Sequence, residues 1–366
     1  MMRSRNDPAG RTTRLAAAFV LSCSGFPGLA VAGDAFADAP CWLLQPSTDR
    51  ITGHIGVSRA YGFTAEQPLQ LARERALGGL VNYLGLEVPA AELTAQGKSS
   101  ADEWEISGHT LRLAASYQAA GWLFQYAYHA PSGEAPATRC ALPRQADPAR
   151  CEPAWVCNPV QPGAVGVVGI SHRAMSLPRQ FSLAQENALQ LLRYSFGVRV
   201  HGGERYFAAG HHLGSVRLRA QDMQVEASGP PPQDVRLYVR EVRFWGDSLL
   251  LWMVSPDLAY YPTPSGAGWV TEIPDGLGHA AVGMAGRTVS NLVSDQVELA
   301  VQRAITELAK AVDVEVEAHD LSARSAQSRY RMSAVSNEVD VSLHARVLAM
   351  YLDDAGKVFV LVVPRK

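Results

Sequence analysis

The sequence predicts an α+β protein in which one module occurs three times, each copy a small, mostly antiparallel sheet with one packed amphipathic helix. Three observations lead to this prediction. A tryptophan–proline–glycine motif recurs along the chain, an alanine-rich helical pattern follows each copy of the motif, and each copy ends in a short apolar run. The chain has 366 residues, which is enough for two or three domains.

The recurring motif begins with a tryptophan, continues with a proline and ends with a glycine inside an apolar run. In the second copy all three residues lie 113 positions after those of the first, and the third copy is more divergent. We expect the tryptophan to anchor a core, the proline to stop strand pairing, and the glycine to lie where a strand approaches a neighbour closely. The motif residues are Trp42, Pro46 and Gly56, then Trp155, Pro159 and Gly169, then Trp269, Pro274 and Gly283.

Apolar residues follow each glycine at helical spacing. In the first copy they recur every three or four positions from 69 to 84, which predicts an amphipathic helix. Thr64 and Ser182, each three residues before a glutamine, fit capping boxes at the helix starts. Alanine pairs occupy corresponding helix positions in the three copies: Ala72 and Ala76, Ala184 and Ala188, and Ala300 and Ala304.

Strand-like apolar runs follow the helices and close each copy. The closing runs at 122–128, 249–254 and 358–363 each lead to a proline. In the second copy we also expect strands at 216–225 and 235–245 to form an antiparallel meander with the closing run. Stretches rich in Pro, Gly, Ala and Ser separate the copies, and the predicted bounds are 41–132 for module 1, 152–257 for module 2 and 268–366 for the more divergent module 3.

The first 32 residues have the features of a secretory signal peptide. Four arginines precede a short apolar run, and Ala30-Val31-Ala32 is a cleavage site of the small-x-small type. Cys23 lies in a loose version of the bacterial lipobox, so lipidation at Cys23 is the alternative to soluble release. No later stretch reaches the roughly 18 apolar residues of a membrane span, so we expect membrane contact only through a lipid anchor. The protein is therefore predicted to be periplasmic, or associated with the outer membrane if Cys23 is lipidated.

Four further cysteines, Cys41, Cys140, Cys151 and Cys157, form an even set, which is typical of disulfides in an oxidising compartment. They allow three pairings. The short spacing of Cys140 and Cys151 favours a bond within a local loop, which would leave Cys41 to pair with Cys157. A zinc site is the weaker alternative, because the cysteines form no CxxC pair and no histidine is nearby.

Composition and motifs predict no catalytic residue, no cofactor and no metal ligand. The net charge of −2 argues against nucleic-acid binding. The glycine-rich stretch 163–169 ends inside a predicted strand, so it does not fit a nucleotide loop. His201, His211 and His212 are expected in an exposed loop. The sequence has no G-x-S-x-G or H-E-x-x-H motif.

The order of motif, strand, helix and hairpin resembles the twenty-kilodalton Lpp lipoprotein family of bacterial envelopes, which is similar in turn to the amino-terminal domain of flagellar assembly protein T. The resemblance implies export, an envelope location and frequent lipidation. It implies no reaction, because the matching positions are packing residues. This chain departs from the family in carrying three modules. The positions that carry the resemblance are Pro153, Trp155, Pro159, Gly169, Ala184 and Ala188, with counterparts Trp42, Pro46, Gly56, Ala72 and Ala76, and Trp269, Pro274, Gly283, Ala300 and Ala304.

These observations favour an exported, non-catalytic envelope protein with a structural or protein-interaction role, of an outer-membrane or flagellar accessory type. Envelope proteins are the expected partners, and self-association is a further option because similar modules offer similar edges. The alternative is a periplasmic module that captures a small molecule or cell-wall fragment. A third hypothesis is an enzyme whose site is assembled from loops 87–107 or 201–214. A cleft lined by the histidines would favour the last two.

Overall fold

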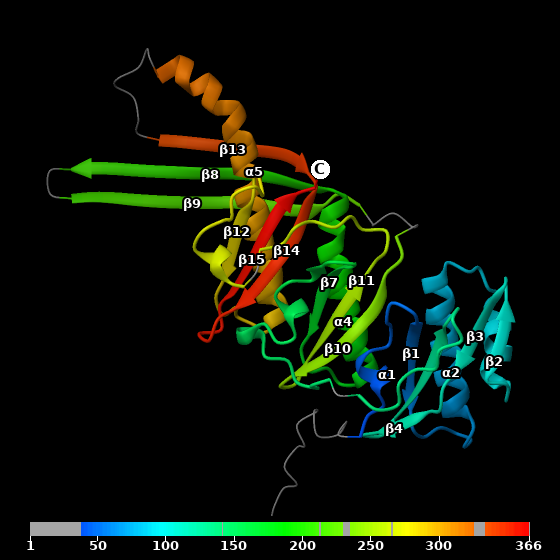
Figure 1. Ribbon diagram of the computed structural model, residues 1–366. Helices are drawn as coiled ribbons and strands as arrows, with labels where there is room; N and C mark the ends of the chain where they lie inside the picture. The colour runs from blue at the N-terminus through cyan, green and yellow to red at the C-terminus, as the bar shows by residue number, and fades with distance from the viewer. Residues whose placement is uncertain are drawn as a thin grey trace, which may run out of the picture. The chain divides into compact units, whose positions relative to one another are not determined.

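The computed structural model describes residues 38–140, 142–211, 214–229, 235–264, 266–325 and 334–365 (Figure 1). The predicted signal peptide at 1–32, the lipidation candidate Cys23 and His212 lie outside the described residues.

The fold is α+β, as predicted, with small antiparallel sheets and few helices. The helices of four residues or more are α1 (Cys41–Leu44), α2 (Gln67–Leu84), α3 (Ala90–Lys98), α4 (Leu177–Arg193) and α5 (Val293–Ser325). Short 3-10 turns are η2 (Pro148–Arg150), η3 (Ala154–Val156), η4 (Tyr194–Phe196) and η5 (Gly268–Val270). The strands are β1 (Thr52–Arg59), β2 (Glu103–Ile106), β3 (His109–Leu113), β4 (Tyr117–Ala119), β5 (Trp122–His129), β6 (Val160–Gln161), β7 (Ala164–Ser171), β8 (Val198–His211), β9 (Gly214–Ala227), β10 (Tyr238–Trp245), β11 (Ser248–Val254), β12 (Ala281–Ala285), β13 (Ala334–Leu343), β14 (Ala345–Leu352) and β15 (Val358–Pro364).

Three of the sheets share one strand order. In each of these sheets, the strand that follows the motif tryptophan (β1, β7 or β12) pairs antiparallel with the closing strand (β5, β11 or β15). A third strand (β3, β10 or β14) pairs with the opposite edge of the closing strand. The orders are β1-β5-β3-β2, with β4 also on β5, then β7-β11-β10, with β6 beyond β7, and then β12-β15-β14. The helices α2, α4 and α5 lie against β1, β7 and β12 respectively (Figure 1).

The motif glycines lie where these strands touch their helices. A Cβ atom on Gly56 would lie 2.0 Å from the carbonyl oxygen of Ala72. A Cβ atom on Gly169 would lie 1.9 Å from that of Ala184, and the corresponding distance from Gly283 to Ala300 is also 1.9 Å. No side chain fits at these distances, so glycine allows strand and helix backbones to meet. The alanine pairs seen in the sequence are the helix residues at this contact.

A second contact recurs one residue later and was not predicted. Each helix carries a polar side chain three residues after the contacting alanine, and it donates a hydrogen bond to the carbonyl group that follows the glycine. The bonds join Arg75 Nη1 to Val57 O at 2.5 Å, Asn187 Nδ2 to Ile170 O at 2.5 Å, and Arg303 Nη1 to Met284 O at 2.6 Å. At each of these three residues the strand pairs with a neighbouring strand on one side only. The helix side chain therefore gives the strand carbonyl group a hydrogen-bond donor.

The motif tryptophans are buried, in agreement with the expected anchoring role. Trp42 stacks on Tyr126 of β5 at a centroid distance of 5.2 Å, and Trp155 stacks on Trp252 of β11 at 6.0 Å. Trp269 packs in a cluster with Leu361 of β15.

The motif prolines also have a defined partner in the first two copies. Tyr126 Oη donates to Pro46 O at 2.5 Å, and Trp252 Nε1 donates to Pro159 O at 3.0 Å. In the third copy the corresponding strand residue, Leu361, has no polar hydrogen to donate, and Pro274 is half-buried. The proline carbonyl group therefore links the tryptophan segment to the sheet in those sheets whose closing strand carries an aromatic donor, Tyr126 or Trp252.

One sheet was not predicted. The strands β8 and β9 form a long hairpin, and β13 pairs with the other side of β8. The expected meander is therefore wrong in part, because β10 pairs with β11 but not with β9. Since β8 falls within predicted module 2 and β13 within predicted module 3, these two stretches share a sheet.

The exposed loop expected around the histidines is wrong for His201, which lies inside β8 opposite Asp340. Val198 and Val200 are fully buried, whereas Arg199 is exposed, and this alternation is that of a strand with one buried face. Two glycines at 202 and 203 concealed the alternation in the sequence. His211 ends β8, and its side chain lies outside the described residues.

Cys41, Cys140, Cys151 and Cys157 all form disulfides, but the preferred pairing was wrong. The bonds are Cys41–Cys140 and Cys151–Cys157. A backbone hydrogen bond from Cys41 N to Thr138 O brings the segment before Cys140 back to α1, which sequence spacing does not reveal. Cys151 follows η2 and Cys157 follows η3, so the local bond closes a short loop around η3 instead.

Neither predicted helix start is correct. Thr64 Oγ1 accepts from Gln67 N at 3.3 Å, and Gln67 Oε1 accepts from Phe63 N at 2.9 Å, but these bonds close the turn before α2, which begins at Gln67 with Glu66 as its N-cap. Helix α4 begins earlier than expected, because Ser176 is its N-cap and accepts from Arg179 N. Ser182 lies inside this helix.

A buried histidine makes stability depend on pH. His54 of β1 packs edge-on against Tyr83 at a centroid distance of 5.0 Å, and its Nδ1 is enclosed without a hydrogen-bond partner. Burial lowers the pKa of His54 from 6.5 to about 4. Between these values the unfolded chain binds more protons than the folded one, so the free energy of unfolding falls as the pH falls from about 6.5 to 4, by up to about 3 kcal/mol.

Urea denaturation at a series of pH values measures this fall. In the His54→Gln variant we expect the loss between pH 6.5 and 4 to shrink markedly. An unchanged pH profile in this variant would show that His54 does not cause the dependence.

Candidate binding groove

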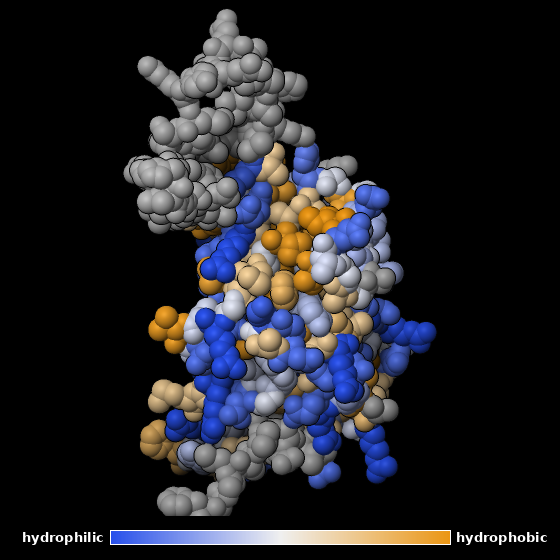
Figure 2. All heavy atoms as spheres, turned by 90° about the vertical axis from the view of Figure 1, so that its left-hand side faces the viewer, coloured by the Kyte–Doolittle hydropathy of each residue, from blue (hydrophilic) through white to orange (hydrophobic). Residues whose placement is uncertain are grey.

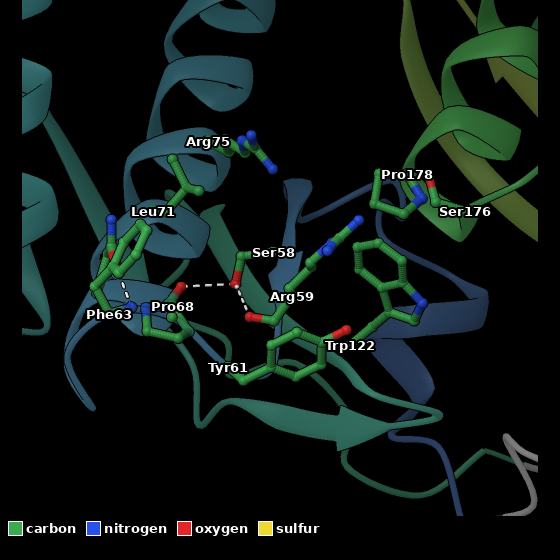
Figure 3. Close-up of a pocket in the computed structure, with 12 residues that line it drawn as sticks. Ser58, Arg59, Tyr61, Phe63, Pro68, Leu71, Arg75, Trp122, Ser176 and Pro178 are labelled. Carbon is green, nitrogen blue, oxygen red and sulfur yellow. Dashed lines mark hydrogen bonds between the residues drawn. The ribbon is translucent and has the colours of Figure 1, made fainter.

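A surface groove of about 690 Å³ lies beside the end of β1. It is bounded by β1 and the loop that follows, by the first turns of α2, by the start of β5 and by the start of α4. Figure 3 shows Phe63 and Leu71 on one side and Trp122 and Pro178 on the other, with the side chains of Arg59 and Arg75 between them. The volume falls in the range of ligand-binding sites, whereas three smaller cavities have room for about one water molecule each.

The local fold positions the groove residues. Arg59 is the last residue of β1 and pairs with Trp122, the first residue of β5. Ala60 N donates to Gly121 O at 2.9 Å, so the chain leaves the sheet directly after this pair. The hydrogen bonds of Gln67 with Thr64 and Phe63 then turn the chain into α2 and hold the backbone of Phe63 at the rim. Two aromatic side chains are thereby presented on a short loop between a strand and a helix.

The groove is lined by exposed apolar side chains. Tyr61 is 68% exposed and Phe63 is 101% exposed, while Leu71 and Pro178 are partly exposed beside them. Met175, which directly precedes the groove residue Ser176, is 106% exposed. Burial of exposed aromatic side chains by a partner is favourable, because it removes apolar surface from water. Groups of such side chains on a protein surface mark interaction sites.

The charge of the groove is positive. Arg59 and Arg75 are exposed, and none of the groove residues that the structure describes is Asp or Glu. Arg75 is held in place because its Nη1 donates to Val57 O. Within the described part of the chain, neither arginine takes part in an ion pair. Both guanidinium groups can therefore meet a carboxylate or phosphate of a ligand.

The groove residues suit binding by stacking, apolar contact and charge. Ser58 Oγ donates to the carbonyl oxygen of Pro68 at 2.7 Å, which occupies its proton. The groove residues that the structure describes include no histidine or carboxylate that could act as its base. The exposed aromatic and apolar side chains can therefore pack against a ligand, and the two arginines can pair with its anionic groups.

Exposed apolar tips recur on the loops that correspond to the groove loop. Phe63 follows β1, Met175 follows β7 at 106% exposure, and Val289 follows β12 at 107%. An arginine precedes each tip: Arg59, Arg173 and Arg287. The first two loops contribute to or adjoin the groove.

A second apolar surface is less exposed. Figure 2 shows hydrophobic side chains gathered on another face of the molecule. On the sheet β12-β15-β14, Met284 and Tyr351 both lie opposite Phe359, and Tyr351 and Phe359 are half-buried against each other at a centroid distance of 6.3 Å. Because these side chains already bury much of their surface in the sheet, we regard the groove as the better candidate site.

The residues singled out in the sequence have structural roles away from the groove. The tryptophans and glycines of the motif lie in the core, and the four cysteines are paired. His201 is half-buried with an unpartnered Nδ1. Among the described residues, no group of three or more His, Cys, Asp or Glu side chains is arranged to hold a metal ion. The groove was not predicted, although the exposed Tyr61-Gly62-Phe63 stretch between a strand and a helix was a usable signal.

The two disulfides indicate an oxidising, exported location. None of the helices in the described ranges is both long enough and apolar enough to cross a bilayer. No model of a known protein family matches the chain, and no curated protein matches it either.

Proposed function

We propose that this chain is an exported, non-catalytic interaction component of a bacterial envelope, and that the groove beside β1 is where a partner protein docks. The observation that carries the proposal is the aromatic groove itself. Tyr61 and Phe63 are exposed on a loop in which Phe63 N donates to Gln67 Oε1, next to Trp122 and the arginines Arg59 and Arg75. Aromatic and arginine side chains dominate the binding energy of protein interfaces.

The rest of the molecule supports a scaffold role. The buried clusters join residues from successive stretches: one contains Trp42 and Phe244, and another contains Trp155 and Ala300. The two disulfides add covalent closure near two of the tryptophans. A rigid support of this kind lowers the entropic cost of presenting an exposed loop to a partner.

The proposal includes an outer-membrane or flagellar accessory setting, which the resemblance of the motifs implies. It also includes a location that is either free in the periplasm or, with a lipid at Cys23, anchored to a membrane. Capture of a cell-wall fragment is the second candidate function. The observation that favours it is the presence of aromatic faces on Tyr61 and Trp122 beside two arginines, since sugar rings stack on aromatic faces and cell-wall peptides carry carboxylates.

Site-specific photo-cross-linking in intact envelopes tests the proposal. A photoreactive residue placed at position 63 or 175 should cross-link one protein strongly, because both side chains are fully exposed at or beside the groove. Positions 260 and 273 serve as controls, because Tyr260 and Ile273 are exposed apolar residues outside the groove. The same products at all four positions, or none at 63 and 175, would contradict docking at the groove.

A further inference from the structure

The groove combines apolar walls with positive charge, and this combination restricts the chemistry of its occupant. We propose that it recognises an extended peptide segment of a partner protein in which carboxylate side chains alternate with aromatic or aliphatic ones. The inference rests on the proposed function and adds the class of ligand to it. Each part of the ligand follows from a separate set of groove residues.

Carboxylates are indicated by the two guanidinium groups. Arg59 and Arg75 are exposed, and no Asp or Glu is found among the residues that line the groove in the described part of the chain. Among the described residues, the one hydrogen bond of the Arg75 guanidinium joins Nη1 to Val57 O, so its other nitrogens can donate to a ligand. Guanidinium groups bind carboxylates through paired, charge-assisted hydrogen bonds.

Apolar side chains are indicated by the walls. Phe63 and Leu71 face Trp122 and Pro178 across the groove (Figure 3). An aromatic or aliphatic side chain inserted between them would bury surface on both walls. At about 25 cal/mol for each Å² of apolar surface, one such side chain contributes on the order of 2 kcal/mol. Charge alone in an open groove is screened by salt, so the apolar contacts are needed for stable binding.

The edge of β1 beside the groove indicates that the ligand is recognised through its side chains rather than by pairing as an added strand. Val57 O, on the side of β1 that does not face β5, already accepts a hydrogen bond from Arg75. A peptide cannot add a full strand to β1 without displacing this bond. The occupant is therefore bound mainly through its side chains, acidic ones at the two guanidinium groups and apolar ones between the walls.

Fluorescence anisotropy with the full chain tests this inference. The probes are a labelled eight-residue peptide that alternates phenylalanine and aspartate, the same peptide with asparagine for aspartate, and the same peptide with lysine. At about 50 mM salt, where charge is weakly screened, the aspartate peptide should bind at least about tenfold more tightly than the other two. The Arg59→Glu variant should lose this preference, whereas Arg287→Glu, in the corresponding loop after β12, should keep it.

Arg75 is left unchanged in this test because it also supports β1. Equal affinity for the three peptides, or no effect of Arg59→Glu, would overturn the charge-based inference while leaving groove docking to the cross-linking result. Binding of a soluble cell-wall muropeptide with no binding of any of the three peptides would assign the groove to cell-wall fragments and overturn the inference. Failure of every probe to bind would also overturn it.

Discussion

Replacement of Gly169 by alanine is expected to lower the free energy of unfolding by about 3 kcal/mol, and Gly56→Ala and Gly283→Ala should have similar effects. In each case the added Cβ atom would lie about 2 Å from a helix carbonyl oxygen. The obstacle is backbone on both sides, so no change of side-chain rotamer can relieve it. The strand and helix must move apart, and the alanine contacts behind the glycine are lost.

Gly286→Ala is the matched control. This glycine lies three residues after Gly283, has no positive φ, and has no atom within 4 Å of the position its Cβ would take. Its replacement should leave stability unchanged or raise it slightly. Chemical denaturation of the four variants measures the difference. A loss below about 1 kcal/mol for all three motif glycines would contradict the close packing described here.

Replacement of Glu241 by glutamine is expected to destabilise the protein by about 3 kcal/mol. Glu241 Oε2 accepts hydrogen bonds from Arg243 Nη2 at 2.7 Å and from Trp155 Nε1 at 2.8 Å. The side chain of Arg243 is 1% exposed, and burial lowers the pKa of Arg243. Without the carboxylate, a buried guanidinium would keep its charge with no counter-charge in contact. The packing of α1 should also be weakened, because Arg243 Nη1 donates to Leu44 O at 3.2 Å.

A double-mutant cycle separates this effect from a simple loss of packing. Arg243→Met removes the buried charge, so Glu241→Gln should cost much less in that background than in the wild-type chain. The same cost in both backgrounds would mean that the ion pair does not account for the loss. Thermal denaturation at neutral pH is sufficient for the comparison.

The elements predicted well are those specified by local chemistry. The apolar stripe of α2, the position of Gly56 and the closing strand at 358–363 depend on residues close in sequence, and the structure has them where the patterns indicated. The α+β class follows from these elements. The pairing of β8 with β13 was missed because it joins residues more than 100 positions apart, and no local pattern specifies that register.

The disulfide pairing and the groove were not predicted for a similar reason. Cys41 meets Cys140 because the chain returns to α1 after β5, which only the three-dimensional path reveals. The groove combines residues from β1, α2, β5 and α4, and no single stretch of sequence contains its pattern. A motif search finds residues that recur, and those residues here have packing roles. The residues of the proposed binding groove are distinguished by their accessibility, which the sequence does not state.

The claim that the groove holds a partner protein is tested most directly by comparing three forms of the chain purified from envelopes. They are the wild type, a groove variant with Tyr61→Ser and Phe63→Ser, and a control variant with Tyr260→Ser and Ile273→Ser outside the groove. The partner protein is identified beforehand by cross-linking from position 63. The amount of this partner recovered with each of the three forms is then quantified. We expect equal recovery with the wild type and the control and at least about a tenfold loss with the groove variant, equivalent to about 1.4 kcal/mol of binding free energy. Equal recovery with all three forms would contradict the account.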